Sequence, residues 1–217
     1  MAKEIPSLPS KLLHDSYKSF FTYRKSVNDI DYSRRYSSWD VCYQYFRDVK
    51  SFDKNSNIAG LHLGFYLASW GMFRGSSELL NSGIKKYNDL AELLISKKHA
   101  GFIEQYNSIE KFLEDNAISA TQTLITKIML GVYANTPAVD QFFNKTTKRY
   151  CKSGIYDKDQ ASKVLDKIKE IFNTKIDSGK TIEKFIEEDL PKSDLSKYKI
   201  LDAIFFEIGR KLNSDEN

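Results

Sequence analysis

Apolar residues recur at three- and four-residue intervals along most of the chain, which is the spacing of one face of an α-helix. In SSWDVCYQYF, for example, Trp39, Cys42, Tyr43 and Phe46 share a face. Alternating patterns typical of strands are few, and only four prolines and ten glycines interrupt the chain. The pattern predicts an all-α fold, a compact bundle of about nine or ten helices forming one body or two closely packed helical lobes.

Turn and capping residues divide this pattern into its helices. Ser37 or Ser38 can cap the second helix, and Asp194 can cap the last. The third segment is apolar on nearly all sides, so we expect it to be the central helix of the core. The expected helices span residues 10–24, 38–50, 58–80, 83–97, 100–114, 119–133, 137–152, 158–172, 181–188 and 195–212.

Length and composition narrow the class of protein. The 217 residues show no evident linker, so we expect one helical domain over residues 1–217. A net charge of +4, from 33 Lys and Arg against 29 Asp and Glu, permits nucleic acid as a partner without requiring it. Two cysteines and three scattered histidines fit neither a disulfide framework nor a zinc site, so no metal and no cofactor is expected.

Several compartments and reaction classes are disfavoured. The N-terminal residues lack the pattern of a signal peptide, and the most apolar run, residues 58–73, falls short of the roughly 20 apolar residues of a membrane span. We therefore expect a soluble, cytoplasmic protein that does not interact with a membrane. The sequence also lacks the phosphate-binding G-x-x-x-x-G-K-[ST] and G-x-G-x-x-G motifs and the H-E-x-x-H and G-x-S-x-G motifs of hydrolases.

Two stripes on the third segment are candidates for function. Small residues form one stripe, which favours either tight packing of another helix or the approach of a ligand or nucleic-acid backbone. Four larger residues at i, i+4 spacing form the other stripe. These residues provide the stacking and hydrogen-bonding groups that a base pocket needs. Alternatively, the three rings are core residues and the arginine points outward to solvent. The stripes are Gly60, Gly64, Ala68, Gly71 and Gly75, and His62, Tyr66, Trp70 and Arg74.

The second helix adds two candidates near its start. Trp39 is a candidate wall of the same base pocket. Asp40 is either a general base or cap in that pocket or an ordinary acid that complements the helix dipole. Cys42 falls on the apolar face, without a histidine or cation at helical spacing, and is interpreted as a core residue.

The segment from Thr121 to Lys152 carries the candidate for chemistry. An apolar helix is followed by the turn TPAV and then by Asp140, the only acid of the segment. The cations that follow are Lys145, Lys148, Arg149 and Lys152. This pattern favours a carboxylate that acts beside a nucleic-acid backbone. It equally fits a helix capped by Thr136 and started by Pro137, in which Asp140 complements the dipole and the lysines form a solvated surface.

Residues 119–155 resemble the centre of the helix-hairpin-helix superfamily of DNA glycosylases. In that family an apolar helix and a short turn precede a V-D-x-x-[IV]-x-R-type helix start that carries the catalytic aspartate. Here the matching residues are Ala138-Val139-Asp140-Gln141-Phe142-Phe143, with KTTKR behind them. The resemblance covers about a sixth of the chain and implies DNA as the partner, Asp140 as the catalytic residue and the basic run as a DNA contact.

The chain departs from that family in three places. Ile118-Ser119-Ala120 replaces the glycine-rich hairpin, so the amides that grip a DNA phosphate are in doubt. Gln122 stands near the position of the lysine of family members with lyase activity, which implies a monofunctional enzyme that leaves an abasic site. The cysteines of an iron–sulfur loop are missing as well.

A second resemblance concerns SSWDVCYQYF and LHLGFYLASWGMFRGSS, which are similar to segments of small bacterial proteins, some of them associated with phage defence. The hypothesis is therefore a DNA-binding, monofunctional glycosylase that excises a modified base, with a role in phage defence. The alternative is a non-enzymatic helical protein that binds nucleic acid or another partner.

Overall fold

The computed structural model describes residues 5–26, 28–151, 154–156, 159–191 and 193–214. Twelve α-helices and one short pair of strands make up this part of the chain, which confirms the all-α class. The first half contains α1 (Ser10–Phe20), the 3₁₀ turn Phe21–Tyr23, β1 (Arg24–Ser26), β2 (Asp29–Ile30), α2 (Ser37–Asp48), α3 (Ile58–Ser69), α4 (Met72–Gly75), α5 (Ser77–Leu80) and α6 (Ile84–Ser96). The second contains α7 (Phe102–Asp115), α8 (Gln122–Val132), α9 (Gln141–Tyr150), α10 (Ala161–Phe172), α11 (Ile182–Glu188) and α12 (Lys197–Ser214).

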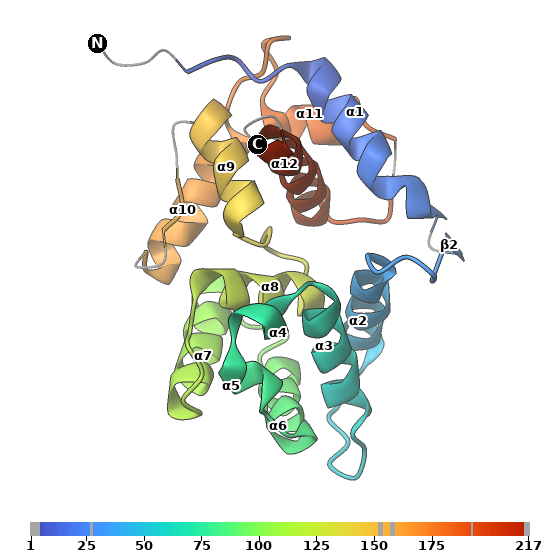
Figure 1. Cartoon of the computed structure of the whole chain (residues 1–217), viewed down its shortest axis with the longest axis vertical. Coiled ribbons are helices and arrows are strands. Elements are labelled where there is room, and N and C mark those ends of the chain that lie inside the picture. Colours follow the sequence, from blue (N-terminus) through green and yellow to red (C-terminus); the bar gives the residue numbers. More distant parts are fainter. Residues whose placement is uncertain (1–4, 27, 152–153, 157–158, 192, 215–217) are drawn as a thin grey trace. The chain divides into compact units, whose positions relative to one another are not determined.

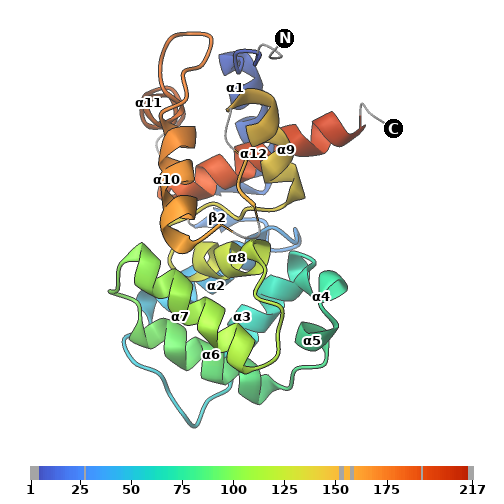
Figure 2. The same ribbon diagram turned by 90° about the vertical axis from the view of Figure 1, so that its left-hand side faces the viewer.

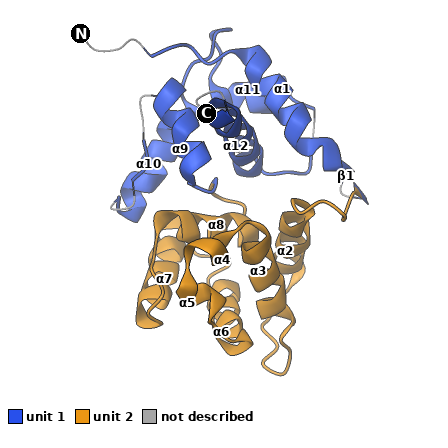
Figure 3. Ribbon diagram, in the orientation of Figure 1, with its two compact units in different colours: residues 1–29, 137–217 blue, residues 30–136 orange. Residues whose placement is uncertain are grey.

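The chain divides into two compact units, coloured separately in Figure 3. Unit 1 comprises residues 1–29 and 137–217, and unit 2 comprises residues 30–136. The expectation of a single domain over residues 1–217 stays a prediction.

Unit 1 is built around α12. This helix lies against α9, α1 and α11, as Figures 1 and 2 show. The residues from Lys199 to Gly209 are all buried, so α12 runs through the apolar centre of the unit. Near the N-terminus, Leu8 pairs with Ile176 in a single parallel bridge, which ties the chain start to the segment between α10 and α11.

Unit 2 is built around α8 rather than around the third predicted helix. Every residue of α8 except Thr123 is buried, and the helix contacts α2, α3 and α7. α3 packs against α6 and α2, but its outer face remains exposed at Ile58, Leu61 and Phe65. The expectation that the all-round apolar segment forms the central helix is therefore wrong, because apolar composition alone does not say how many faces are covered.

The helix expected over residues 58–80 is divided into α3, α4 and α5. Gly71 has φ of 77°, in the left-handed region that glycine adopts without strain, and it ends the first piece. Ser76 is extended, and its hydroxyl accepts the amide hydrogen of Leu79 at 3.1 Å, which starts α5. Two of the five small residues thus lie outside α3, and the predicted continuous stripe is wrong.

Two predicted helix starts also differ from the structure. Neither Ser37 nor Ser38 caps α2, because both lie inside the helix and the Ser37 hydroxyl donates to the carbonyl of Arg34 at 2.7 Å. Asp194 does not cap α12, since its carboxylate binds the guanidinium of Arg24 through two hydrogen bonds of 2.8 Å. The hydroxyl of Ser196 instead accepts the amide hydrogen of Lys199 at 3.2 Å.

Candidate functional site

Asp140 is the N-cap of α9. Its backbone is extended, with φ of −96° and ψ of −178°. Its Oδ1 accepts the amide hydrogens of Phe142 and Phe143 at 3.0 and 2.9 Å. Two amides that the helix itself cannot satisfy are thus bound by one carboxylate oxygen. The expectation that Thr136 caps this helix and Pro137 starts it is wrong, because α9 begins at Gln141.

The turn before α9 is anchored to α12 by a buried ion pair. The amide of Ala138 donates to Oδ1 of Asp202 at 3.1 Å, and the amide of Asp140 donates to the carbonyl of Ala138 at 3.0 Å. The other oxygen of Asp202 accepts from the ammonium of Lys199 at 3.1 Å. The two side chains are 3% and 0% exposed, so this charge pair is shielded from water and holds the turn that carries Asp140.

The first turns of α9 lie directly on the backbone of α12. A Cβ added at Gly209 would lie 2.0 Å from the carbonyl oxygen of Phe142, so only glycine permits this approach. The hydroxyl of Thr146 donates to the carbonyl of Phe205 at 2.6 Å. Asp140 therefore stands at the start of a helix whose position is fixed by backbone contact as well as by side chains.

The basic residues follow on α9 with different degrees of exposure. Lys145 is partly buried and donates to Oδ1 of Asn213 at 3.3 Å. Lys148 and Arg149 are exposed in the last turn of the helix. Lys152, the fourth predicted DNA contact, lies outside the described residues. The described cations therefore extend from the middle of α9 to its C-terminal end, with no acid among residues 141–151.

Two of the rings assigned to a base pocket lie in the core of unit 2. Trp39 is 1% exposed and its indole N–H donates to the carbonyl of Leu130 at 2.9 Å. Tyr66 is fully buried, and its hydroxyl donates to the carbonyl of Lys127 at 3.0 Å. These contacts match the alternative reading of the rings as core residues. Asp40, also assigned to the pocket, is 1% exposed in the first turn of α2.

The remaining pocket candidates do not form the straight line that a continuous helix would give. His62 is on α3, Trp70 is the C-cap of that helix, and Arg74 is exposed on α4. The ring of His62 is stacked on that of Tyr45 at 4.4 Å, and burial lowers its pKa. The ring of Trp70 faces the ammonium of Lys127 at 5.3 Å. The predicted spacing fails because α3 ends before Trp70.

Asp140 and the basic run belong to unit 1, whereas all six residues assigned to the base pocket belong to unit 2. Within unit 1, the structure brings Asp140, Ala138, Asp202 and Lys199 together. A joint site that includes the base-pocket residues stays a prediction.

The loop between α7 and α8 has a backbone conformation that the sequence did not suggest. Ala117 has φ of 54°, in the left-handed region that usually selects glycine. Ile118 is buried next to it, and the hydroxyl of Thr121 accepts the amide hydrogen of Leu124 at 3.2 Å to cap α8. A helix, a tight left-handed turn and a capped helix are therefore present without the glycine-rich sequence.

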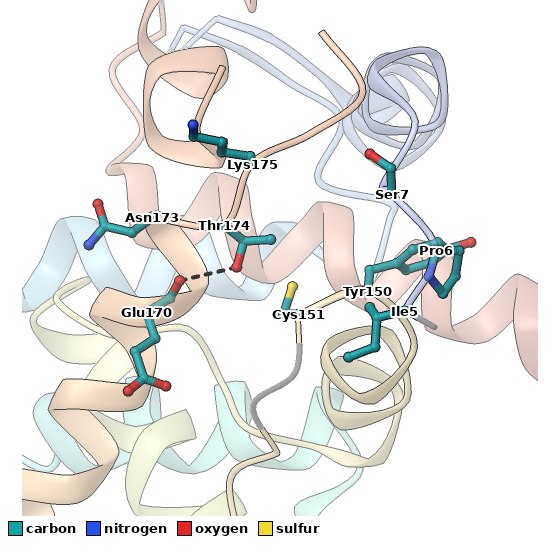
Figure 4. A pocket seen from close by; sticks show the side chains of 9 residues that line it. All are labelled: Ile5, Pro6, Ser7, Tyr150, Cys151, Glu170, Asn173, Thr174 and Lys175. Atoms are coloured by element: carbon teal, nitrogen blue, oxygen red, sulfur yellow. Dashed lines mark hydrogen bonds between the residues drawn. The ribbon is translucent and has the colours of Figure 1, made fainter. Parts of the chain in front are cut away.

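A mixed polar and apolar hollow of about 500 Å³ opens in unit 1, and Figure 4 shows its lining. It lies between residues 5–7, the end of α9 and the end of α10. Cys151 lines it, and burial raises the pKa of the thiol to about 12. Such a thiol stays protonated at neutral pH.

Two further properties concern the residues that the structure describes, namely metal-ligating clusters and helices long enough to cross a membrane. These residues contain no cluster of His, Cys, Asp or Glu suited to a metal ion. None of the described helices combines the length and apolar character that crossing a membrane requires.

Sequence reasoning missed the Lys199–Asp202 pair and Gly209. A signal for the pair exists, since Lys199 and Asp202 interrupt the apolar run YKILDAIFF at i, i+3 spacing. Nothing local marks Gly209, because its neighbour is more than 60 residues away in sequence.

No protein-family model, curated protein or solved structure gives a significant match to the chain. The resemblance to the helix-hairpin-helix glycosylases therefore stays a prediction.

Proposed function

We propose that this protein is a DNA-binding, monofunctional DNA glycosylase in which Asp140 acts on the sugar of a flipped nucleotide. The observation that carries the proposal is the placement of Asp140 at the start of α9. The segment before this helix is hydrogen-bonded to Asp202, and the helix itself contains cations and no acid. A carboxylate in a fixed position beside a surface for phosphates suits chemistry on a nucleic-acid sugar.

The proposed reaction hydrolyses one N-glycosidic bond. The base leaves with the bonding electron pair as positive charge develops on the sugar, and the oxygen of a water molecule forms the new bond to C1′. One proton of that water ends on the departing base, so the products are a free base and an abasic sugar. Asp140 stabilises the developing charge and orients the water, while Lys148 and Arg149 neutralise neighbouring phosphates.

The departures from the glycosylase pattern shape the proposal. Gln122 in place of a lysine supports hydrolysis without strand cleavage. The loop at Ala117 does not add to the proposal, because the amides of Ala117 and Ile118 already donate to the carbonyls of Glu114 and Leu113. A modified base as the target and phage defence as the setting are inferred from the resemblance alone.

One observation favours a second candidate, a helical protein that binds nucleic acid or another partner without chemistry. Oδ1 of Asp140 already accepts two amide hydrogens, and this N-cap role by itself accounts for an aspartate at the position. The two candidates differ in whether the negative charge of Asp140 is needed, beyond its ability to accept hydrogen bonds.

The deciding comparison is therefore Asp140→Asn with Asp140→Ala. Asparagine keeps an oxygen acceptor for the two amides but loses the charge, whereas alanine loses both. Wild type and variants are incubated with unmodified, uracil-containing, alkylated and modified-cytosine DNA, and abasic sites are then cleaved with alkali. We expect Asp140→Asn to lower excision at least about 100-fold while its unfolding curve stays close to that of wild type.

Thr181→Ala is the matched control for loss of a cap. The Thr181 hydroxyl accepts the amide hydrogen of Lys184 at 3.3 Å and caps α11 in the same unit. This change and Asp140→Ala should each cost about 1 kcal/mol of stability, but only the latter should abolish excision. Excision by Asp140→Asn at the wild-type rate, or intact strands with wild type at concentrations where DNA is bound, would overturn the enzymatic assignment.

A further inference from the structure

An exposed tyrosine lies among cations between α9 and α10 of unit 1. Tyr156 is 55% exposed, although large aromatic residues are usually more deeply buried. The ammonium of Lys148 lies 5.4 Å from the centre of its ring, and that of Lys167 lies 4.8 Å from it. Both distances are those of cation–π contacts.

The backbone of Tyr156 is held by a buried carboxylate. Its amide donates to Oδ2 of Asp159 at 2.9 Å, and the amide of Asp159 donates back to the carbonyl of Tyr156 at 2.9 Å. Lys167 donates to the same Oδ2 and to the carbonyl of Gly154, and Lys163 binds Oδ1 at 2.7 Å. The backbone of Tyr156, which carries the exposed ring, is therefore bound to Asp159 in both directions.

Among the described residues, the charged side chains at this ring and in the adjoining last turn of α9 are positive on balance. Asp159 is the one described acid of the group, and two lysines, Lys163 and Lys167, compensate it. Lys148 and Arg149 add two exposed positive charges from the last turn of α9. The group thus combines a π surface with uncompensated cations, which is the combination that single-stranded nucleic acid requires.

Exposure of a tyrosine is not by itself unusual in this chain, since Tyr32 in unit 2 is 60% exposed. Among the cation–π contacts of the described residues, none involves the ring of Tyr32. Tyr32 therefore provides an internal comparison, because it offers a similarly exposed ring without a cation–π contact.

We infer that Tyr156, Lys148 and Arg149 form a binding site for an unpaired nucleotide of DNA. The base stacks on the exposed part of the Tyr156 ring, and the adjoining phosphates bind Lys148 and Arg149. This inference rests on the proposed function for its choice of DNA, and it adds that the bound DNA contains an unpaired nucleotide away from the one that is excised. Lys148 follows Asp140 by eight residues, or about 12 Å of helix, which is the length of three to four stacked nucleotides.

The test measures binding without chemistry. A fluorescent single strand and the duplex of the same sequence are titrated with the full chain carrying Asp140→Asn, at low salt, and anisotropy reports the dissociation constants. Loss of one stacked base should weaken binding at least about fivefold. We therefore expect Tyr156→Ala to weaken single-strand binding by that factor, Tyr156→Phe to bind like the parent, and Tyr32→Ala to have no effect. Lys148→Ala together with Arg149→Ala should weaken binding and reduce its dependence on salt.

The outcomes separate this site from the proposed enzyme. Equal affinity of Tyr156→Ala and its parent for the single strand, or equal losses with single strand and duplex, overturns the site even if excision is observed. Absence of any single-strand binding by the parent at low salt also overturns it. The expected loss in Tyr156→Ala, combined with no excision by the wild-type chain, supports the site and removes the enzyme.

Discussion

Both units use a glycine to bring two elements into close contact, but the neighbouring groups differ in kind. In unit 1, a Cβ at Gly209 would meet the backbone carbonyl oxygen of Phe142 at 2.0 Å. In unit 2, a Cβ at Gly131 would meet the ring atom Cε1 of Tyr66 at 2.3 Å. A ring can rotate or shift, whereas a carbonyl in the first turn of a helix cannot move without the helix. The contact in unit 1 is therefore the less adaptable one.

The polar groups near the two glycines also differ, since those near Gly209 are charged and those near Gly131 are neutral. Near Gly209, the turn before α9 is bound by the charged pair Lys199–Asp202. Near Gly131, the neutral side chains of Trp39 and Tyr66 donate to carbonyls of α8. Loss of one charged partner leaves a buried charge behind, and loss of a neutral donor leaves only a carbonyl. The candidate catalytic residue thus lies near the less adaptable of these two contacts.

Removal of Lys199 should have the largest effect. Lys199→Met fills a similar volume but leaves the carboxylate of Asp202 buried without its ammonium. We expect a loss of about 3–5 kcal/mol in the free energy of unfolding, measured by urea denaturation followed by circular dichroism. The double change Lys199→Met with Asp202→Asn removes both charges and keeps an acceptor for the amide of Ala138, so it should recover most of the loss. A single-variant cost below about 1 kcal/mol would show that the pair is not structurally important.

Gly209→Ala should come next. The added methyl group collides with the backbone of Phe142, so α9 must move away from α12. We expect a cost of about 3 kcal/mol, at the upper end of the usual range for overpacking, in the same denaturation experiment. Gly75→Ala on α4 is the control, because its Cβ meets nothing within 4 Å and alanine favours helix. Similar stabilities of the two variants would contradict the close approach.

Gly131→Ala should cost less, about 2 kcal/mol, since the Tyr66 ring can partly adjust. The ring accounts for the clash, so Tyr66→Leu should reduce the additional cost of Gly131→Ala. A double-mutant cycle of urea unfolding energies measures this coupling, which we expect to exceed about 1 kcal/mol. Additive effects of the two changes would show that another group opposes the methyl.

Local sequence pattern was sufficient for the fold class and for most helices, because helical periodicity and capping are local properties. α11, for example, spans Ile182–Glu188, where a helix over residues 181–188 was expected. The pattern failed at Gly71, where the conformation of one residue ends a helix in the middle of an apolar run. A glycine in such a run is equally compatible with close packing, so the sequence alone does not distinguish the two.

The candidate site was predictable only in part. The residues next to Asp140 in sequence were enough to predict a helix start there and a basic helix after it. The ion pair that holds the turn and the glycine that admits α9 come from α12, about 60 residues later, and no local pattern connects them to Asp140. The burial of Trp39 and Tyr66 likewise depends on α8, which is distant in sequence from both.

The smallest predicted effect concerns stability in acid. It tests whether Asp159, with Lys163 and Lys167, stabilises unit 1 as the Lys199–Asp202 pair does. Burial would raise the pKa of Asp159, but hydrogen bonds from Lys163, Lys167 and the amide of Tyr156 outweigh it and hold the pKa at about 2. Because the pKa in the folded state lies below that of the unfolded chain, near 4, the stabilisation is present above pH 4 and is lost as the pH falls towards 2. The side chain of Lys163 is 62% exposed, so water screens this cluster more than the Lys199–Asp202 pair.

We therefore expect wild type to lose about 1 kcal/mol more than Asp159→Asn between pH 5 and pH 2, measured by urea unfolding at each pH. Lys167→Met should show an intermediate difference, because one of the hydrogen bonds that lower the pKa is gone. Parallel pH profiles of wild type and Asp159→Asn would mean that the carboxylate gains nothing from folding. In that case the Lys199–Asp202 pair would be the one acid–lysine contact of the two that stabilises unit 1.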